Sequence, residues 1–481
     1  MDGTTIPHKI QRNGQRLATS PAYFERNEDG WQATSWSRYA GQVKRAAKAL
    51  IALGMGEGEP VTILGFNRPE WVIMDIAAMT AGGVPAGIYA TSSPDECAYI
   101  LNHSEAGVVL VEDEEQWRKV VSKRSELPHL RWVVTMRGTA VTDAQTLSWD
   151  DFMARGGDID DTVLRSRMER LSADRLGTMI YTSGTTGPPK AVMLSHDNLA
   201  WTAQQAADIV HMSPGDRVLS YLPLSHIAEQ VFTIHGAATS GYAVYYARSI
   251  EQLRDDLQEV RPTIFFGVPR VWEKMAAGIT EELGKASGVR ARLASAAMKV
   301  ARKATDHHNR GVTAPLVTRL QHGLFSKLVY SKVKAAIGLD DCRAAVSGAA
   351  PIAVEVLQLF ASFDLPIHEV YGQSEDTGPT SFNQPGRTRF GTVGPAYPGV
   401  EIRIADDGEI LVKGRNVFKG YYKDAEATAE TLVDGWLQSG DLGEFDDDGF
   451  LYITGRKKDI IITAGGKNVA PKLIEGGLKN D

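Results

Sequence analysis

Short apolar segments alternate with amphipathic helical segments along most of this 481-residue chain, and this alternation constrains the fold more than any other feature. The segments that read as strands are residues 60–66, 83–89, 107–111, 216–222, 242–246, 263–268, 342–347 and 367–371. The helices expected between them include residues 37–51, 70–82, 94–102, 227–240 and 352–363. Strands and helices that alternate in this way predict an α/β fold with parallel sheets and helices on both faces.

The pattern changes in two places. Residues 271–337 are rich in Lys, Arg, Ala and Gln, which favours helices. From residue 391 onward, short strand-like runs at 400–404, 408–413 and 449–454 alternate with turn sequences such as DDG and DG. This texture predicts a small antiparallel region, either barrel-like or a meander, near residues 391–455.

Length and composition exclude several classes of protein. A chain of 481 residues exceeds what one hydrophobic core usually supports, so at least two sub-cores are expected. A formal net charge of −7 gives no reason to expect nucleic acid as a partner. The two cysteines, Cys97 and Cys342, suit a reducing compartment, and no signal peptide or membrane-spanning run is visible. We expect a cytoplasmic protein, and no amphipathic basic helix argues for the membrane contact that its substrate would permit.

Residues 181–190, with the sequence YTSGTTGPPK, form the most distinctive loop of the chain. Glycines let the backbone turn inward, hydroxyl and amide groups can face one anion, and Lys190 adds a cation. The sequence predicts a phosphate-binding loop between two strands. It is not the common G-x-x-x-x-G-K-[ST] loop, because Pro189 and Ala191 stand where that motif requires Gly and Ser or Thr. A plain polar turn is the alternative interpretation.

Three other strand-end loops are rich in polar and small residues: 223–229, 347–351 and 371–378. Such loops gather at the carboxyl edge of an open parallel sheet, where ligands bind. Lys190 for phosphates, Glu375 for a metal ion and Asp441 for ribose hydroxyls together suggest a nucleotide–Mg²⁺ site.

Five motifs in order carry a family resemblance: YTSGTTGPPKAVMLSH, SGAAP, YGQSE, GWLQSGDLG and FLYITGRKKDIIITAGGKNVAP. They resemble the core motifs of the adenylate-forming superfamily, which includes acyl-CoA synthetases, luciferases and peptide-synthetase adenylation domains. Within it, the chain is most similar to bacterial long-chain fatty acid–CoA ligases, including the bubblegum-type branch. The resemblance implies that a carboxylate attacks the α-phosphorus of ATP to give an acyl-adenylate and pyrophosphate, and that CoA then displaces AMP. The partners would be a fatty acid, ATP and CoA, with Mg²⁺ as cofactor, in a monomer or homodimer.

The resemblance also assigns residues. Tyr371 would stack on adenine, Asp441 would hold the ribose and His226 would border the substrate carboxylate. The implied catalytic residues are Thr182, Lys190, His226 and Glu375, of which Thr182 and Glu375 would hold Mg²⁺. The implied nucleotide-binding residues are Ser183, Gly184, Thr185, Thr186, Gly187, Gly348, Ala349, Ala350, Tyr371, Gly372, Gln373, Ser374, Asp441, Ile453, Arg456 and Lys458. An apolar acyl tunnel is expected near residues 227–236 and 268–272.

By the same resemblance, residues 1–455 would form the large adenylation domain, and residues 456–481 the hinge and the start of a C-terminal α+β lid that is mostly absent. The catalytic lysine of that lid would then be absent too, and both half-reactions would be affected. Two alternatives stay open: a ligase for another carboxylic acid or with a carrier-protein acceptor, and a catalytically silent acyl-nucleotide binding protein.

Overall fold

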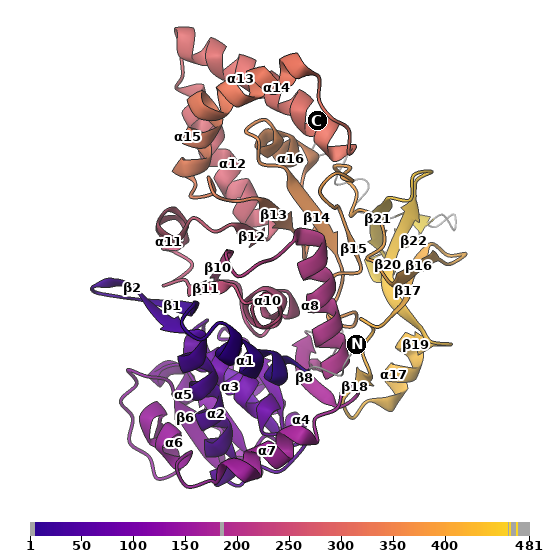
Figure 1. Ribbon diagram of the computed structural model, residues 1–481. Coiled ribbons are helices and arrows are strands. Elements are labelled where there is room, and N and C mark those ends of the chain that lie inside the picture. Colours follow the sequence, from indigo (N-terminus) through magenta and orange to yellow (C-terminus); the bar gives the residue numbers. More distant parts are fainter. Residues whose placement is uncertain (1–4, 183–186, 460, 463–467, 470–481) are drawn as a thin grey trace. The chain divides into compact units, whose positions relative to one another are not determined.

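The computed structural model describes residues 5–182, 187–459, 461–462 and 468–469. The chain divides into two compact units, and the colours of Figure 1 follow the chain through them. The first unit comprises residues 1–207, 212–253 and 418–425, and the second comprises residues 208–211, 254–417 and 426–481. The predicted domain boundary at residue 455 stays a prediction.

An eight-stranded sheet forms the centre of the first unit, with strand order β18-β9-β8-β4-β3-β5-β6-β7. Its strands are β3 (Pro60–Leu64), β4 (Val84–Ile88), β5 (Val108–Val111), β6 (Trp132–Thr135), β7 (Thr146–Ser148), β8 (Leu176–Thr182), β9 (Lys190–Ser195) and β18 (Gly420–Tyr421). All pairings are parallel except β8–β9 and β9–β18. Every residue of β3, β4 and β5 is buried, as expected for parallel strands covered on both faces. The prediction of a mainly parallel sheet is confirmed.

Helices of the first unit include α1 (Ile6–Arg16), α2 (Trp36–Ala52), α3 (Pro69–Thr80), α4 (Pro94–Ser104), α5 (Glu114–Val121), η1 (Arg124–Glu126), α6 (Trp149–Arg155), α7 (Asp161–Glu169) and α8 (His196–Val210). Three of these helices, α2, α3 and α4, correspond to the predicted segments 37–51, 70–82 and 94–102. The face of α2 that carries Tyr39, Val43 and Leu50 is buried, as its spacing predicts. A capping box of Ser93 and Glu96 starts α4, with each side chain accepting the other's backbone N–H. Neither α1 nor strand β1 (Pro21–Asn27) is among the predicted elements.

A second, four-stranded sheet of this unit has the order β10-β11-β1-β2. It contains β2 (Gly30–Ser35), β10 (Arg217–Ser220) and β11 (Ala243–Tyr246) beside β1. The helix expected at 227–240 is present as α9 (Ile227–Gln230), a π-helical turn η2 (Val231–His235) and α10 (Gly236–Ser240). A π turn inside a helix is a local irregularity that hydrophobic spacing alone does not reveal.

The second unit holds a four-stranded sheet of order β12-β13-β14-β15. Its strands are β12 (Ile264–Gly267), β13 (Ala344–Ser347), β14 (Ile367–Tyr371) and β15 (Ser381–Phe382). Its helices are α11 (Leu253–Val260), which begins at the boundary of the units, α12 (Pro269–Gly284), α13 (Gly288–Asn309), α14 (Leu316–Phe325), η3 (Ser326–Tyr330), α15 (Ser331–Ala336) and α16 (Val354–Ala361). Trp272 is fully buried against the rings of Phe265 and Phe360, so this end of the predicted tunnel region is packed core.

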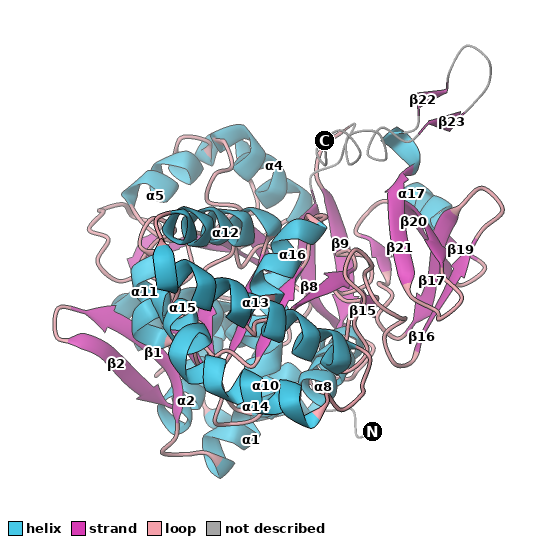
Figure 2. Cartoon of the chain, turned by 90° about the horizontal axis from the view of Figure 1, so that it is seen from above, coloured by secondary structure: helices cyan, strands magenta, loops and turns pink. Residues whose placement is uncertain are grey.

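The antiparallel region is confirmed as a partial, curled sheet of five strands, visible edge-on in Figure 2. It contains β16 (Val400–Ile404), β17 (Glu409–Gly414), β19 (Leu432–Val433), β20 (Trp436–Phe445) and β21 (Leu451–Arg456). Helix α17 (Ala425–Thr431) precedes β19, η4 (Lys457–Asp459) follows β21, and β22 (Ile461–Ile462) pairs with β23 (Asn468–Val469). The turn at residues 405–408 connects β16 to β17, and the turn at residues 446–449 connects β20 to β21.

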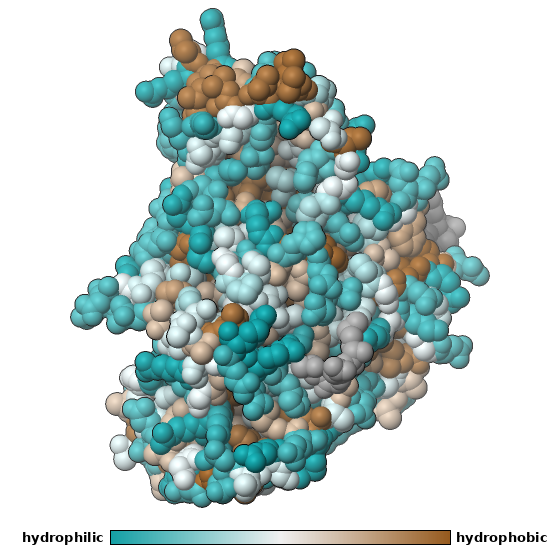
Figure 3. Space-filling model, in the orientation of Figure 1, coloured by the Kyte–Doolittle hydropathy of each residue, from teal (hydrophilic) through white to brown (hydrophobic). Residues whose placement is uncertain are grey.

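Helix α14 differs from what the sequence suggested. It exposes Leu316, Val317, Leu320 and Leu324, and apolar side chains gather over α13 and α14 at the top of Figure 3. Helix α14 carries Arg319 as its only Lys or Arg, so it is not a basic helix, and helix propensity alone does not show which apolar face stays uncovered. Among the described residues, no helix combines the length and the apolar character needed to cross a membrane.

Candidate functional site

The four strand-end loops belong to three different sheets, so the expectation of a single shared sheet edge is wrong. Loop 181–190 follows β8 in the eight-stranded sheet, and loop 223–229 follows β10 in the second sheet of the first unit. Loops 347–351 and 371–378 do lie side by side. They follow β13 and β14, which are parallel neighbours with Ser347 opposite Glu369.

Loop 347–351 presents backbone rather than side chains. A Cβ at Gly348 would lie 2.7 Å from Val370 Cγ1, so the strand pair admits no side chain there. Ala349 follows with φ of 69°, a left-handed conformation that a residue with a Cβ rarely adopts. Ala349 and Ala350 are both exposed. Backbone held in such a conformation is typical of ligand-binding loops.

Asp441 on β20 is the centre of a polar cluster in the second unit. Its Oδ2 accepts hydrogen bonds from Tyr371 Oη at 2.8 Å and from Gln373 Nε2 at 2.7 Å. Its Oδ1 lies 3.3 Å from Arg456 Nε, because β21 pairs with β20 in a register that sets these two residues opposite each other. Three predicted site residues, from the ends of β14 and β21, thus converge on the carboxylate of a fourth.

Burial within this cluster decides the protonation of Tyr371. The Asp441 side chain is 8% exposed. Burial, and then the neighbouring Asp441 carboxylate, raise the pKa of Tyr371 well above its usual value. Tyr371 therefore stays protonated and keeps donating to Asp441.

Asp376 is a residue of this region that the sequence did not single out. It accepts a hydrogen bond from Gln373 N at 2.6 Å and another from the Thr380 hydroxyl, and so closes the loop after β14. Burial raises the pKa of Asp376 well above its usual value. The only sequence signal was an acidic residue next to Glu375 in a polar loop, which does not distinguish a buried loop closure from a solvated turn.

Gly372 occupies the tightest point of that loop. An added Cβ would lie 1.4 Å from the carbonyl oxygen of Gly378, closer than any non-bonded contact allows. The two glycines approach because Gly378 N donates to Gln373 O at 2.9 Å. The predicted role of Gly372 in shaping the site thus has a steric basis.

Other predicted residues of the second unit lie around this loop. Ser374 is buried and its carbonyl oxygen accepts from Thr377 N at 3.1 Å, whereas Glu375 is half-buried. Ile453 is half-buried on β21, where it pairs with Gly443 of β20. Lys458 lies exposed in η4.

In the first unit, the antiparallel pair β8–β9 carries the predicted phosphate loop, with Thr182 opposite Lys190. The predicted residues Ser183, Gly184, Thr185 and Thr186 lie outside the described part of the chain. Gly187 is exposed, and a Cβ built on it meets nothing within 4 Å.

Lys190 stands at the start of β9 with its side chain 44% exposed. Its Nζ lies 3.6 Å from Asp424 Oδ2 and 5.0 Å from the centre of the Tyr421 ring. A half-exposed ammonium held by one distant carboxylate and one ring keeps most of its hydrogen-bonding capacity for an anion.

His226 caps the N-terminus of α9, where its Nδ1 accepts a hydrogen bond from Ala228 N at 3.1 Å. Burial lowers the pKa of His226, so the ring is neutral at pH 7. A neutral imidazole that accepts at Nδ1 carries its proton on Nε2 and can donate from there. The sequence had offered a backbone cap as the alternative role, and the cap is present.

Glu229, three residues further on, is a second buried acid that the sequence did not single out. Its Oε1 accepts from Thr233 Oγ1 at 2.6 Å and from Ser220 Oγ at 2.7 Å. Burial raises the pKa of this carboxyl to about 7. It links β10 to the π turn behind His226.

Glu369, on the strand that leads to Tyr371, gives a testable pH dependence. It is buried, one carboxylate oxygen accepts from Gly391 N at 3.0 Å, and burial raises its pKa from 4.5 to about 8. The folded state thus holds a proton that the unfolded state releases above pH 4.5, so the contribution of Glu369 to stability falls as pH rises from 4.5 to 8. We expect Glu369→Gln to remove this contribution and to gain about 5 kcal/mol relative to wild type over that window.

Urea unfolding of both proteins at several pH values between 5 and 8 measures this difference. Glu355→Gln, at an exposed position of α16, is the matched control and should change stability little at any pH. A difference between Glu369→Gln and wild type that does not vary with pH would contradict the assignment.

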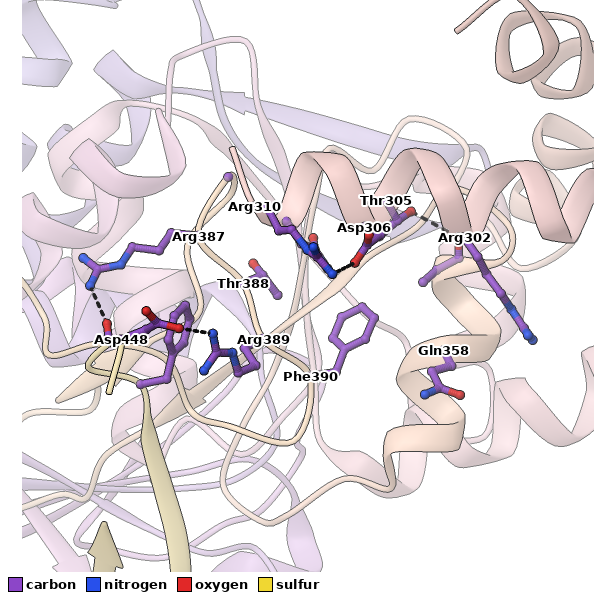
Figure 4. A pocket seen from close by; sticks show the side chains of 14 residues that line it. Arg302, Thr305, Asp306, Arg310, Gln358, Arg387, Thr388, Arg389, Phe390 and Asp448 are labelled. Carbon is purple, nitrogen blue, oxygen red and sulfur yellow. Dashed lines mark hydrogen bonds and ion pairs between the residues drawn. The ribbon is translucent and has the colours of Figure 1, made fainter. Parts of the chain in front are cut away.

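A cavity of about 900 Å³ lies elsewhere in the second unit, and Figure 4 shows the residues that line it. Four of them are arginines: Arg302, Arg310, Arg387 and Arg389. Arg389 pairs with Asp446 and Asp448, and Arg310 pairs with Asp306 at 3.0 Å. The cavity contains none of the predicted site residues, so we treat it separately from the Asp441 cluster.

Comparison with known proteins shows which family this chain is similar to. The family model described as "AMP-binding enzyme" matches residues 10–422. The long-chain-fatty-acid–CoA ligase ACSBG2 of Xenopus laevis is 39% identical, and the alignment covers 99% of this chain and 66% of that protein. The Homo sapiens protein of the same name is 38% identical, with 99% and 72% covered. The chain thus spans about two thirds of the length of these relatives.

Among solved structures, the anthranilate CoA ligase AuaEII in complex with anthranoyl-AMP has a TM-score of 0.76 at 21% identity. The match covers 98% of this chain and 82% of that one, and it shows a common fold. The family model and the two ligases confirm the resemblance that the five motifs indicate. The chain belongs to the AMP-binding enzyme family, in which these curated relatives are named long-chain-fatty-acid–CoA ligases.

Proposed function

We propose that this protein activates a long-chain fatty acid with ATP and transfers the acyl group to CoA. In the first step a carboxylate oxygen attacks the α-phosphorus, and the bond to pyrophosphate breaks. In the second step the CoA sulfur attacks the acyl carbonyl, and AMP leaves. Support comes from the family and from the names of the curated relatives. Because the chain spans 66% of the Xenopus relative, the complete activity and its substrates are proposals.

The observation that carries the proposal is the cluster around Asp441. Its two oxygens already contact Tyr371, Gln373 and Arg456. A carboxylate offers about four acceptor positions and three are engaged, so Asp441 retains one position on Oδ1 for a ribose hydroxyl. We propose that it holds the ribose while Tyr371, whose hydroxyl is fixed by the same carboxylate, presents its ring to adenine.

The phosphates are assigned to the β8–β9 loop. Lys190 would neutralise charge that develops on the phosphates as pyrophosphate departs. The Thr182 hydroxyl and the Glu375 carboxylate are the hard oxygen donors that Mg²⁺ takes, and both residues are partly exposed. Mg²⁺ held by either oxygen would supply further charge neutralisation. We assign His226 Nε2 to a hydrogen bond with the substrate carboxylate.

Asp441→Asn tests the nucleotide role of the cluster. The substitution removes the negative charge of the buried Asp441 carboxylate, so it weakens the proposed hydrogen bonding from the ribose. A hydrogen bond to a charged group is worth about 1.5–3 kcal/mol. We therefore expect the Kd for AMP, measured by calorimetry, to rise about 10- to 100-fold. Asp407→Asn is the matched control, since Asp407 also pairs with a cation, Lys457 at 2.7 Å, but is half-exposed. Equal AMP affinity in Asp441→Asn and wild type would contradict the assignment.

The reaction itself is tested by exchange of labelled pyrophosphate into ATP, which reports the first step alone. We expect exchange that depends on a fatty acid and is at least about tenfold faster with palmitate than with acetate, because each buried methylene adds about 0.8 kcal/mol. Faster exchange with acetate or an aromatic acid would favour the alternative of another carboxylic acid. Tight binding of ATP with no exchange for any acid would favour the catalytically silent alternative.

A further inference from the structure

Residues 288–337 form a surface that the proposed reaction does not use, and we call it the basic helical segment. It comprises α13, α14, η3 and α15. It contains ten Lys or Arg residues and one acidic residue, Asp306, in a chain of formal net charge −7. Positive charge is thus concentrated in this segment, whereas the whole chain carries a net negative charge.

The segment also exposes an apolar stripe. Leu316, Leu320 and Leu324 are 67%, 67% and 58% exposed, and Leu328 continues the same spacing of four residues at 44%. Residues spaced by four lie on one face of a helix. None of the ten residues of α14 is fully buried. Figure 3 shows these apolar side chains gathered among polar ones, an arrangement that usually marks an interaction site.

The other side of the helices is held firmly, so the stripe does not result from a loosely attached helix. Tyr330 is fully buried and donates to the carbonyl of Ala297 on α13 at 2.6 Å. His322 of α14 lies 2.9 Å from Asp364, which follows α16. These contacts fix η3 against α13 and α14 beside the end of α16, while the leucines of α14 stay exposed.

Exposed cations occur next to the stripe in sequence and along the rest of the basic helical segment. Arg319 and Lys327 directly precede Leu320 and Leu328 in sequence, and both are exposed. The other exposed cations of the segment that form no ion pair within the described part of the chain are Arg290, Arg292, Lys299, Arg302, Lys303 and Lys332. Unpaired surface cations next to apolar side chains suit a partner that offers negative charge and hydrocarbon together.

The cavity of Figure 4 extends this charge. Arg302 of α13 and Arg310, which follows that helix, line it together with Arg387 and Arg389, against the carboxylates of Asp306 and Asp448. Four guanidinium groups against three carboxylates, those of Asp306, Asp446 and Asp448, leave the cavity with one excess positive charge, and guanidinium groups bind phosphate well. Anionic headgroups are therefore favoured at this cavity as well as at the exposed cations of the segment.

We propose that the basic helical segment docks the protein on a bilayer that contains anionic lipids, with the leucine stripe among the acyl chains and the cations among the phosphates. The positive charge of the segment favours an anionic bilayer over a second copy of the chain as the binding partner, because two copies would bring like-charged surfaces together. The inference goes beyond the proposed reaction. Long-chain fatty acids partition into bilayers, so docking would bring the protein to where such a substrate collects.

Flotation of the protein with vesicles tests the proposal without ATP or acyl substrate, so it can fail independently of the proposed reaction. We expect binding at least about tenfold tighter to vesicles of phosphatidylcholine mixed with phosphatidylglycerol than to phosphatidylcholine alone, and weaker binding at high salt. Equal, salt-independent binding to both, or no binding to either, would overturn the proposal.

Two sets of variants locate the surface. The triple variant Leu316→Gln, Leu320→Gln and Leu324→Gln should lose at least about tenfold in vesicle affinity. Ile250→Gln with Val433→Gln is its control, because these exposed apolar residues lie outside the segment. Arg319→Gln with Lys327→Gln should remove most of the preference for anionic vesicles, whereas Arg165→Gln with Lys274→Gln, also exposed, should not.

Circular dichroism and sedimentation velocity complete the test. All substituted residues are at least partly exposed, so each variant should fold. If the triple variant binds vesicles as wild type does, the proposal is wrong. If wild type dimerises and the leucine substitutions abolish the dimer while vesicle binding persists, the stripe covers a second copy and the membrane proposal is likewise wrong.

Discussion

Replacing Lys190 with Met is expected to slow fatty-acid-dependent pyrophosphate exchange by about 100- to 1000-fold. The ammonium group is half-exposed at the start of β9, 3.6 Å from one carboxylate, so its charge is available to a phosphate. Because an exposed ion pair contributes at most about 1 kcal/mol to stability, the variant should unfold at nearly the wild-type urea concentration. Met keeps the length of the side chain and removes only the charge.

Lys423→Met is the matched control for that experiment. Lys423 is similarly exposed in the same unit, and it pairs with Glu105 at 2.7 Å and lies 5.0 Å from the Tyr422 ring. It therefore repeats the environment of Lys190, a carboxylate and an aromatic ring, at a position with no predicted role. Exchange rates that fall equally in both variants, or in neither, would contradict the role of Lys190.

Replacing Gly372 with Ala is expected to destabilise the protein by about 3 kcal/mol or more and to abolish AMP binding. The new Cβ would overlap the carbonyl oxygen of Gly378, and both atoms belong to backbone that the strand and the loop hydrogen bonds hold in place. Relief requires the loop to open, which separates Gln373 from Asp441. Urea unfolding and AMP calorimetry measure the two effects.

Gly278→Ala is the matched glycine control. A Cβ at this exposed position of α12 meets nothing within 4 Å. Since Ala favours a helix over Gly by about 1 kcal/mol, this variant should be slightly more stable than wild type. If Gly372→Ala proves as stable as wild type, the close approach of Gly372 and Gly378 is not a feature of the folded protein.

The sequence predicted elements better than their arrangement. Strands such as β3 and helices such as α2 follow from local periodicity, because each buries a face that its own residues define. The order of strands depends on contacts between distant segments, and so the division of four loops among three sheets could not be read from the chain. The π turn Val231–His235 and helix α1 left no distinct signal either.

In the candidate site, too, the sequence identified residues but not how they come together. Tyr371, Asp441 and Arg456 were identified through motif resemblance, but their convergence depends on β20 pairing with β21 and on Tyr371 reaching across 70 residues of sequence. Asp376 and Glu229 were missed because burial, not sequence, distinguishes them from ordinary surface acids. The exposed stripe of α14 was missed for the opposite reason, since apolar residues at helical spacing are usually assumed to be buried.

The most direct test of the account is calorimetric binding of the chain to non-hydrolysable acyl-adenylate analogues, from acetyl to about twenty carbons. A site that holds the adenosine through Asp441 and buries a long acyl chain predicts affinity that rises with chain length and levels off beyond about twelve carbons, at up to about 0.8 kcal/mol per buried methylene. Affinity that is the same for every chain length would keep the nucleotide site and contradict a long-chain substrate. Absence of binding to every analogue would contradict the adenylate-forming site itself.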